Sequence, residues 1–261
     1  MKNTAMKKIG NRLAAPKRSE GGKSKIGNSL AFTLVELLVV ISIIGVLAGF
    51  TLPVLKMVKA AQYKKVARGE LEFIETALEN YKAKYGVYPP GNQNLNSVYT
   101  TYGQDRSQFS QLYYELSGTA QTTIGGVNYF VTLDGSQQIP VSNPGKDALQ
   151  AYGVGGFVNC TKGGGEDGIS AKNFLSGLSS KQVNTVSNNA VPGTAMLVTS
   201  VGGPDVTYQP LGVSGLNPFR YIYPGSNNPT SYDLWVQLVI NGQTNLICNW
   251  SRQVQINSPL P

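Results

Sequence analysis

The chain has 261 residues, of which 14% are charged and 41% are hydrophobic. This composition is too polar for a multi-span membrane protein and too apolar for a disordered chain. The net charge of +8 is unevenly spread, because eight of the 22 Lys and Arg but only one of the 14 acids lie in residues 1–31. The rest of the chain is close to neutral, so the basic balance does not indicate a nucleic-acid-binding protein.

The sequence contains no His, which is the commonest general base and metal ligand. No nucleophile motif such as Gly-x-Ser-x-Gly is present, and the acids are scattered. The segment Lys162–Gly168 is rich in Gly but is not a phosphate-binding loop, because its Lys precedes the glycines. We interpret it as a flexible turn. The sequence therefore predicts a protein that is not an enzyme and has no catalytic or metal site.

Residues 1–31 form a basic segment without apolar periodicity, and an apolar run follows it. From Leu37 to Leu55 the chain carries no charge over about 19 residues, enough to cross a bilayer core of roughly 30 Å as a helix. The basic segment predicts a cytoplasmic N-terminus, with the bulk of the chain on the other side. Glu36 lies at the edge of the run, where a charge costs about 2.5–3.5 kcal/mol, which indicates a functional role.

The segment Ala31–Leu38, Ala-Phe-Thr-Leu-Val-Glu-Leu-Leu, resembles the signal of type IV pilins and of type II secretion pseudopilins. The resemblance implies that a prepilin peptidase cleaves between Ala31 and Phe32, that Phe32 is then N-methylated, and that Glu36 serves assembly. In the family the residue before the cut is usually Gly, and here it is Ala31.

The apolar run suggests two further hypotheses. The carboxylate of Glu36 could pair with the α-amine of the cleaved Phe32 of a neighbouring subunit, which would offset the cost of a charge in lipid. Gly45, Gly49 and Pro53 could let the helix bend or melt between bilayer and filament. The plainer interpretation of Pro53 is a kink in a membrane helix.

The helical pattern continues beyond Pro53 to Tyr85 and ends at Gly86 and Pro89-Pro90. Apolar residues recur every three or four positions and predict one buried stripe: Val58, Ala61, Tyr63, Val66, Ala67, Leu71, Ile74, Leu78, Tyr81 and Tyr85. Basic residues come first on the polar side and acidic residues follow. We interpret them as a solvated face or, alternatively, as complementary charges on staggered subunits.

Residues 87–261 are rich in Gly, Asn, Ser, Thr and Tyr, and this composition predicts a soluble domain that contains β-strands. We interpret the Tyr residues as strand residues, and the alternative interpretation is that they bind sugars or DNA by stacking. We expect short helices at 107–116 and 170–178, and strands at 127–133, 195–201, 219–223, 234–240 and 244–248. Asn241-Gly242 predicts a tight type I′ hairpin between the last two strands. The expected fold class is α+β and pilin-like, a long N-terminal helix packed on a C-terminal antiparallel sheet.

Three C-terminal segments, 217–225, 232–235 and 248–250, resemble the closing strands of major pseudopilins of the type II secretion (GspG-like) kind. The family binds calcium in an acidic loop near this end. The corresponding loop here, Val239–Asn245, has no carboxylate, and Asp233 alone is not a site, so we expect no calcium and no other cofactor. Cys160 and Cys248 are a candidate disulfide or two semi-buried thiols.

The predicted organisation is a leader at 1–31, a transmembrane and assembly helix at 32–55, an amphipathic continuation at 56–86 and an extracytoplasmic domain at 87–261. The resemblance implies a single-pass inner-membrane subunit of a type II secretion pseudopilus, with prepilin peptidase, other pilin-like subunits and the inner-membrane secretion machinery as partners. A type IV pilus subunit for adhesion or DNA uptake is an alternative. A signal-anchored extracytoplasmic binding protein or enzyme is another, and it would not require Glu36.

Overall fold

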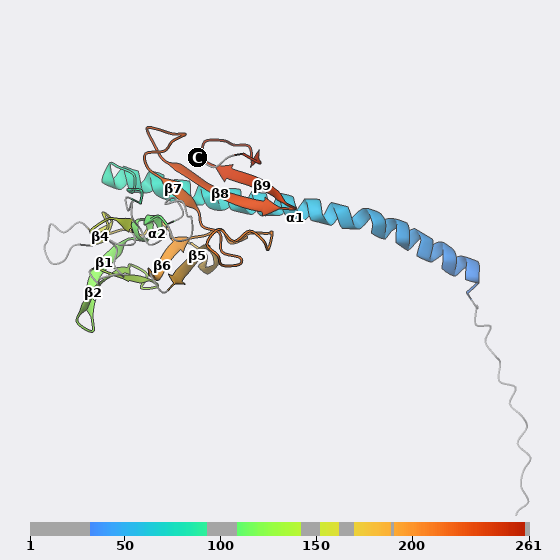
Figure 1. The fold of residues 1–261 in the computed structure, drawn as a ribbon, viewed down its shortest axis with the longest axis horizontal. Helices are drawn as coiled ribbons and strands as arrows, with labels where there is room; N and C mark the ends of the chain where they lie inside the picture. The colour runs from blue at the N-terminus through green and yellow to red at the C-terminus, as the bar shows by residue number, and fades with distance from the viewer. Residues whose placement is uncertain (1–31, 93–108, 142–151, 162–169, 189–190, 259–261) are drawn as a thin grey trace, which may run out of the picture. The chain divides into compact units, whose positions relative to one another are not determined.

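The computed structural model describes residues 32–92, 109–141, 152–161, 170–188 and 191–258 (Figure 1). The chain divides into two compact units, Met1–Leu52 and Pro53–Pro261. The turn predicted at Lys162–Gly168 lies outside the described residues.

The longest element is the helix α1, which runs from Leu34 to Tyr85 and confirms the predicted long helix. Its end is fixed by Gly86, whose φ is +78° and whose amide donates a 2.7 Å hydrogen bond to the carbonyl of Lys82. Glycine adopts this left-handed conformation without a steric cost, so it is the usual residue just beyond a helix.

One stripe of α1 is buried in the second unit. Ala67, Leu71, Ile74, Leu78 and Tyr81 are each no more than 1% exposed, at the spacing of three and four that one helix face requires. The predicted stripe started too early, because Val58 and Ala61 are exposed. Packing against the core begins only near Ala60 and Tyr63.

The C-terminal sheet covers this stripe. It consists of β7 (Arg220–Ile222), β8 (Asp233–Ile240), β9 (Gln243–Cys248) and β10 (Gln255–Ile256), in the order β10-β9-β8-β7. Every neighbouring pair is antiparallel. Leu234, Val236 and Leu238 alternate along β8 and share one hydrophobic cluster with the buried stripe of α1. The predicted hairpin is confirmed, with φ of 53° at Asn241 and 76° at Gly242.

A second region adds α2 (Leu112–Ser117), β1 (Thr119–Ile124), β2 (Val127–Thr132), β3 (Gln138–Pro140) and β4 (Cys160–Thr161). These strands form a sheet in the order β3-β2-β1-β4, in which only β1 and β4 are parallel. A 3-10 turn, η3 (Ser180–Gln182), leads into a two-stranded sheet of β5 (Val183–Asn188) and β6 (Val191–Leu197). The whole is an α+β architecture, as the sequence predicts.

Several expected elements differ from the structure. The helix expected at 107–116 begins only at Leu112, and residues 107–108 are not described. The strand expected at 195–201 lies at Val191–Leu197. The prediction of a helix at 170–178 is wrong. The backbone amides of this segment bind tertiary partners instead, since Lys172 donates to the Asn159 side chain at 2.8 Å and Phe174 to the Leu116 carbonyl at 2.8 Å.

The two cysteines lie in different clusters. Cys160 belongs to the main core, and Cys248 packs with Trp235 and Leu246 on the other face of the C-terminal sheet. Both are buried free thiols, so the candidate disulfide is not formed.

Candidate functional site

The candidate site is the start of α1, where Thr33 and Glu36 form a reciprocal capping box. The backbone amide of Thr33 donates to Oε2 of Glu36 at 2.9 Å, and the Thr33 hydroxyl donates to the same oxygen at 2.8 Å. In return, the amide of Glu36 donates to the Thr33 hydroxyl at 3.2 Å. Such a box satisfies amides that have no partner inside the helix. The sequence pattern Thr-x-x-Glu at residues 33–36 indicates this cap, and it gives Glu36 a structural role besides the predicted assembly role.

The capping box holds the carboxylate of Glu36 at the helix start, close to the predicted cleavage site. Phe32 is 75% exposed, and Ala31 lies outside the described residues. The predicted methylation residue, Phe32, therefore lies two residues before α1, and the predicted assembly residue, Glu36, lies in the first turn of the helix. The structure leaves the ring of Phe32 accessible.

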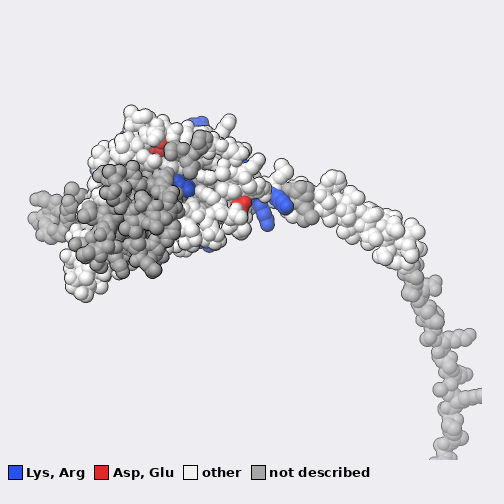
Figure 2. Space-filling model, viewed as in Figure 1, with Lys and Arg blue, Asp and Glu red and all other residues white. Residues whose placement is uncertain are grey.

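The apolar surface that follows is unburied. Leu37, Ile41 and Ile44 are each 58–59% exposed, and the face of the first unit drawn in Figure 2 shows no charged side chain on its described part. In the described part of the chain, one helix is long and apolar enough to cross a membrane, with a mean hydropathy of 2.6 over its best window. A surface of this kind needs lipid or other apolar helices around it.

The three residues predicted to give flexibility all lie within α1. A Cβ added at Gly45 or Gly49 would meet no atom within 4 Å, so neither glycine is required by packing inside the described chain. Flexibility at Gly45, Gly49 and Pro53 remains a prediction.

The second half of α1 is anchored to the domain by two of its charged residues. Arg68 donates from Nη1 to the carbonyl of Cys248 at 2.7 Å and from Nη2 to that of Ser251 at 3.0 Å. Glu70 accepts from the hydroxyl of Thr199 at 2.7 Å and also from the hydroxyl of Ser200. Neither charge belongs to a purely solvated face, and the sequence could not show this because the partners lie more than 120 positions away.

A buried carboxylate connects the same helix to the second region. Glu115 is fully buried and accepts from the Tyr81 hydroxyl at 2.9 Å and from the amides of Val158 and Asn159 at 2.9 and 3.0 Å. Burial raises the pKa of the Glu115 carboxyl, although these three donors act to lower it. Sequence reasoning missed Glu115, and its only signal was one acid among the apolar residues of 112–116.

Two other acids have local structural roles. Asp233 is buried and accepts from the backbone amides of Asn227 and Asn228 at 2.7 and 3.0 Å. Asp205 lies between β6 and β7 and contacts the β8–β9 hairpin, where its amide donates to the Val239 carbonyl at 3.0 Å. Among the residues described, no group of three or more His, Cys, Asp or Glu is placed to hold a metal ion.

Comparison with known proteins agrees with the site. Residues 27–52 match the model of the prokaryotic N-terminal methylation motif. The chain is 38% identical over 78 residues to the type II secretion system core protein G of Vibrio cholerae, covering 29% of this chain and 52% of that protein. It is 43% identical over 67 residues to the core protein G of Escherichia coli, covering 26% of this chain and 46% of that protein.

The chain thus spans about half the length of the curated relatives that it matches. No solved structure matches it. The motif match includes the predicted cleavage site and Glu36, and so confirms the resemblance inferred from Ala31–Leu38. The chain is therefore prepilin-like and similar, over part of its length, to the core protein G of type II secretion systems.

Proposed function

We propose that this chain is a structural subunit of a pseudopilus in a type II secretion system. A prepilin peptidase cleaves it between Ala31 and Phe32, Phe32 is N-methylated, and α1 then packs with the helices of other pilin-like subunits. The observation that carries the proposal is the match of residues 27–52 to the methylation motif. This segment includes the first residues of an exposed apolar helix. The role is structural rather than catalytic.

The proposed location follows from the same segment. Before assembly, the apolar half of α1 spans the inner membrane once, with the basic N-terminus in the cytoplasm and the 87–261 domain outside it. In this state the inner-membrane secretion machinery is the neighbouring partner. The domain stays attached to the helix through the Arg68 and Glu70 anchors, so α1 carries it into the filament.

Glu36 has a specific role in this proposal. In the uncut chain its carboxylate is held by Thr33. Cleavage creates a new positive charge, the α-amine of Phe32, at the same depth in the membrane. Pairing of this amine with Glu36 of a neighbouring subunit offsets the cost of the buried charge and sets the step between subunits.

The test compares Glu36→Gln with Glu72→Gln in cells whose own copy of this chain is deleted. Glu72 is an exposed acid on the second half of the same helix, so it controls for loss of one carboxylate. We expect Glu36→Gln to be processed but to yield no sheared filaments and no secreted proteins, and Glu72→Gln to behave as wild type. Normal filaments and secretion with Glu36→Gln would contradict the pairing. A second result would contradict the secretion role itself. In that case the deletion strain would still secrete its proteins, and the filaments would be required for adhesion or DNA uptake.

A further inference from the structure

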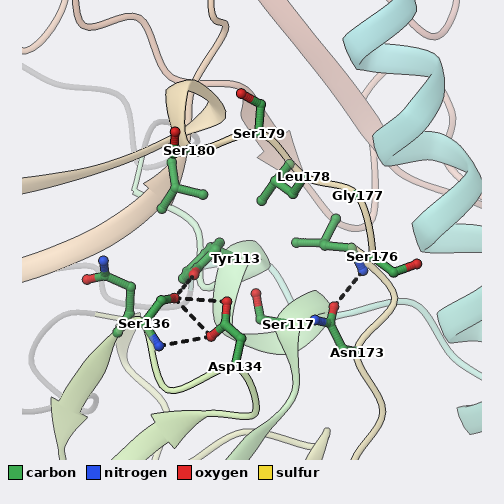
Figure 3. A pocket seen from close by; sticks show the side chains of 13 residues that line it. Tyr113, Ser117, Asp134, Ser136, Asn173, Ser176, Gly177, Leu178, Ser179 and Ser180 are labelled. Atoms are coloured by element: carbon green, nitrogen blue, oxygen red, sulfur yellow. Dashed lines mark hydrogen bonds between the residues drawn. The ribbon is translucent and has the colours of Figure 1, made fainter.

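A pocket of about 390 Å³ lies in the second unit, between α2, the turn that follows β2 and the segment 173–183 (Figure 3). This volume is within the range of about 300–1,000 Å³ that is typical of small-molecule sites. Nothing in the proposed assembly role uses this pocket.

The pocket lining is dominated by neutral polar groups. Hydroxyls of Tyr113 and five serines, together with the amides of Gln137 and Asn173, line it. Hydroxyl and amide groups both donate and accept hydrogen bonds, so this surface matches a ligand that does the same. Leu175, Leu178 and Val183 add a small apolar wall.

The polar groups are held in place before any ligand arrives. Asp134 accepts from the Thr132 hydroxyl at 2.6 Å and from the amide of Ser136 at 3.0 Å. The hydroxyls of Tyr113 and Ser136 are 3.0 Å apart. Asn173 uses its Oδ1 to accept from the amide of Leu175 at 2.8 Å, and Figure 3 shows its amide nitrogen pointing toward Ser117. Groups fixed in this way lose little entropy on binding.

Charge narrows the class of ligand. Asp134 is the one charged residue among the described residues of the lining, which include no Lys or Arg. Burial acts to raise the pKa of Asp134, but hydrogen bonds from Thr132 and Ser136 keep it below its ordinary value of 3.8, so the group is ionised at neutral pH. An anionic ligand such as a phosphate would meet a carboxylate and no cation. A divalent cation would find one carboxylate where it needs several charged oxygens.

We propose that this pocket binds a neutral saccharide unit. The ring hydroxyls donate to the carboxylate of Asp134 and exchange hydrogen bonds with the Tyr113, Ser117 and Asn173 side chains. The C–H face of the sugar lies on the wall formed by Leu175 and Leu178.

The experiment uses the full chain, purified in a detergent that has no sugar headgroup, because a glucoside or maltoside detergent would compete for the pocket. Glucose, galactose, N-acetylglucosamine and maltose are titrated, and binding is followed by saturation-transfer NMR. We expect at least one of these sugars to bind with a Kd in the millimolar range or tighter.

Two variants locate the binding. Asp134→Asn should weaken it by about tenfold to a hundredfold, because a hydrogen bond to a charged group is lost. Tyr113→Phe removes one hydroxyl and keeps the buried ring, so it tests the pocket even where Asp134→Asn lowers the melting temperature. Asp205→Asn is the matched control, since Asp205 accepts similarly from the amide and hydroxyl of Thr207 at 3.0 and 2.7 Å and lies outside the pocket.

Each result decides the question. A sugar that binds to wild type and Asp205→Asn, and more weakly to the pocket variants, supports the proposal. Absence of binding by all four sugars overturns it, as does equal binding to Tyr113→Phe and wild type. Methylammonium is titrated in parallel as a probe for organic cations, and its binding without binding of any sugar also overturns the proposal.

Discussion

The hydroxyl of Tyr81 donates a 2.9 Å hydrogen bond to the carboxylate of Glu115, and both side chains are completely buried. Tyr81 lies on α1 and Glu115 on α2, so this contact joins the helix to the region that carries β1–β4. Tyr85 strengthens the junction by donating to Oδ1 of Asn159 at 2.6 Å. The three donors to Glu115 are all neutral, which makes the junction sensitive to any change at this carboxylate.

Glu115→Gln should destabilise the domain by about 1–3 kcal/mol. The side-chain NH2 of glutamine donates hydrogen bonds and cannot accept them, so it would face the backbone N–H of Val158 or Asn159 without forming a hydrogen bond. Glu72→Gln, at an exposed position, should change stability by less than about 0.5 kcal/mol. The measurement is denaturant unfolding of the full chain followed by tryptophan fluorescence. Equal stability of the two variants would contradict the role assigned to Glu115.

The same residue predicts a pH dependence. Burial raises the pKa of Glu115 above its ordinary value of 4.5, so the folded protein binds this proton more tightly than the unfolded chain. The stability from this group is fully present below about pH 4.5 and is lost as the pH rises through the folded pKa. The stability difference between wild type and Glu115→Gln should therefore shrink over that window. A difference that grows with pH would contradict the direction of the shift.

Arg68→Met should loosen the chain end that follows β9. Methionine keeps an apolar stem but loses the hydrogen bonds to the carbonyls of Cys248 and Ser251, at a cost of about 1–3 kcal/mol. Lys65→Met is the control, because Lys65 is exposed on the same helix. Hydrogen exchange should show faster exchange in residues 249–254 for Arg68→Met only. Unchanged protection there would mean that Arg68 is not an anchor.

Replacement by alanine should have opposite effects on stability at two glycines. Gly242 has a φ of 76°, where a Cβ is strained, so Gly242→Ala should cost about 1–2 kcal/mol. Gly69 lies inside α1, and a Cβ there would meet nothing within 4 Å, so Gly69→Ala should stabilise by about 0.5–1 kcal/mol. Thermal unfolding of both variants checks the pair, and a loss of stability in Gly69→Ala would show that this position is constrained by contacts beyond the described chain.

Local patterns in the sequence predicted the long helix, its end at Gly86 and the Asn241-Gly242 hairpin. Each depends on residues close together in the chain, where periodicity and backbone preference decide the structure. The prepilin resemblance, likewise, depends on one contiguous segment, Ala31–Leu38.

Features set by distant partners could not be predicted in this way. The segment 170–178 looked helical, but its amides are satisfied by Asn159 and Leu116. Arg68, Glu70 and Glu115 looked like ordinary charges, and only the fold supplies their partners. The pocket around Asp134 is formed by three segments between residues 113 and 183, a meeting that no local motif encodes.

Calcium should have no effect on the folded domain. The β8–β9 loop carries no carboxylate. Asp205, whose carboxylate the backbone of Gly242 contacts, already accepts from the amide and hydroxyl of Thr207. Because a ligand that binds only the folded state raises stability, millimolar calcium or a chelator should shift the melting temperature by less than about 1 °C. Magnesium serves as the control. A saturable rise of several degrees with calcium alone would reveal a site.

Processing at the start of α1 is the central claim, and the intact mass and N-terminal sequence of the protein isolated from its own membranes test it most directly. We predict a chain that begins at Phe32 and is heavier by one methyl group. A chain that still begins at Met1, or one cut within the apolar run near Phe50, would contradict the prepilin account and leave a tethered or secreted domain.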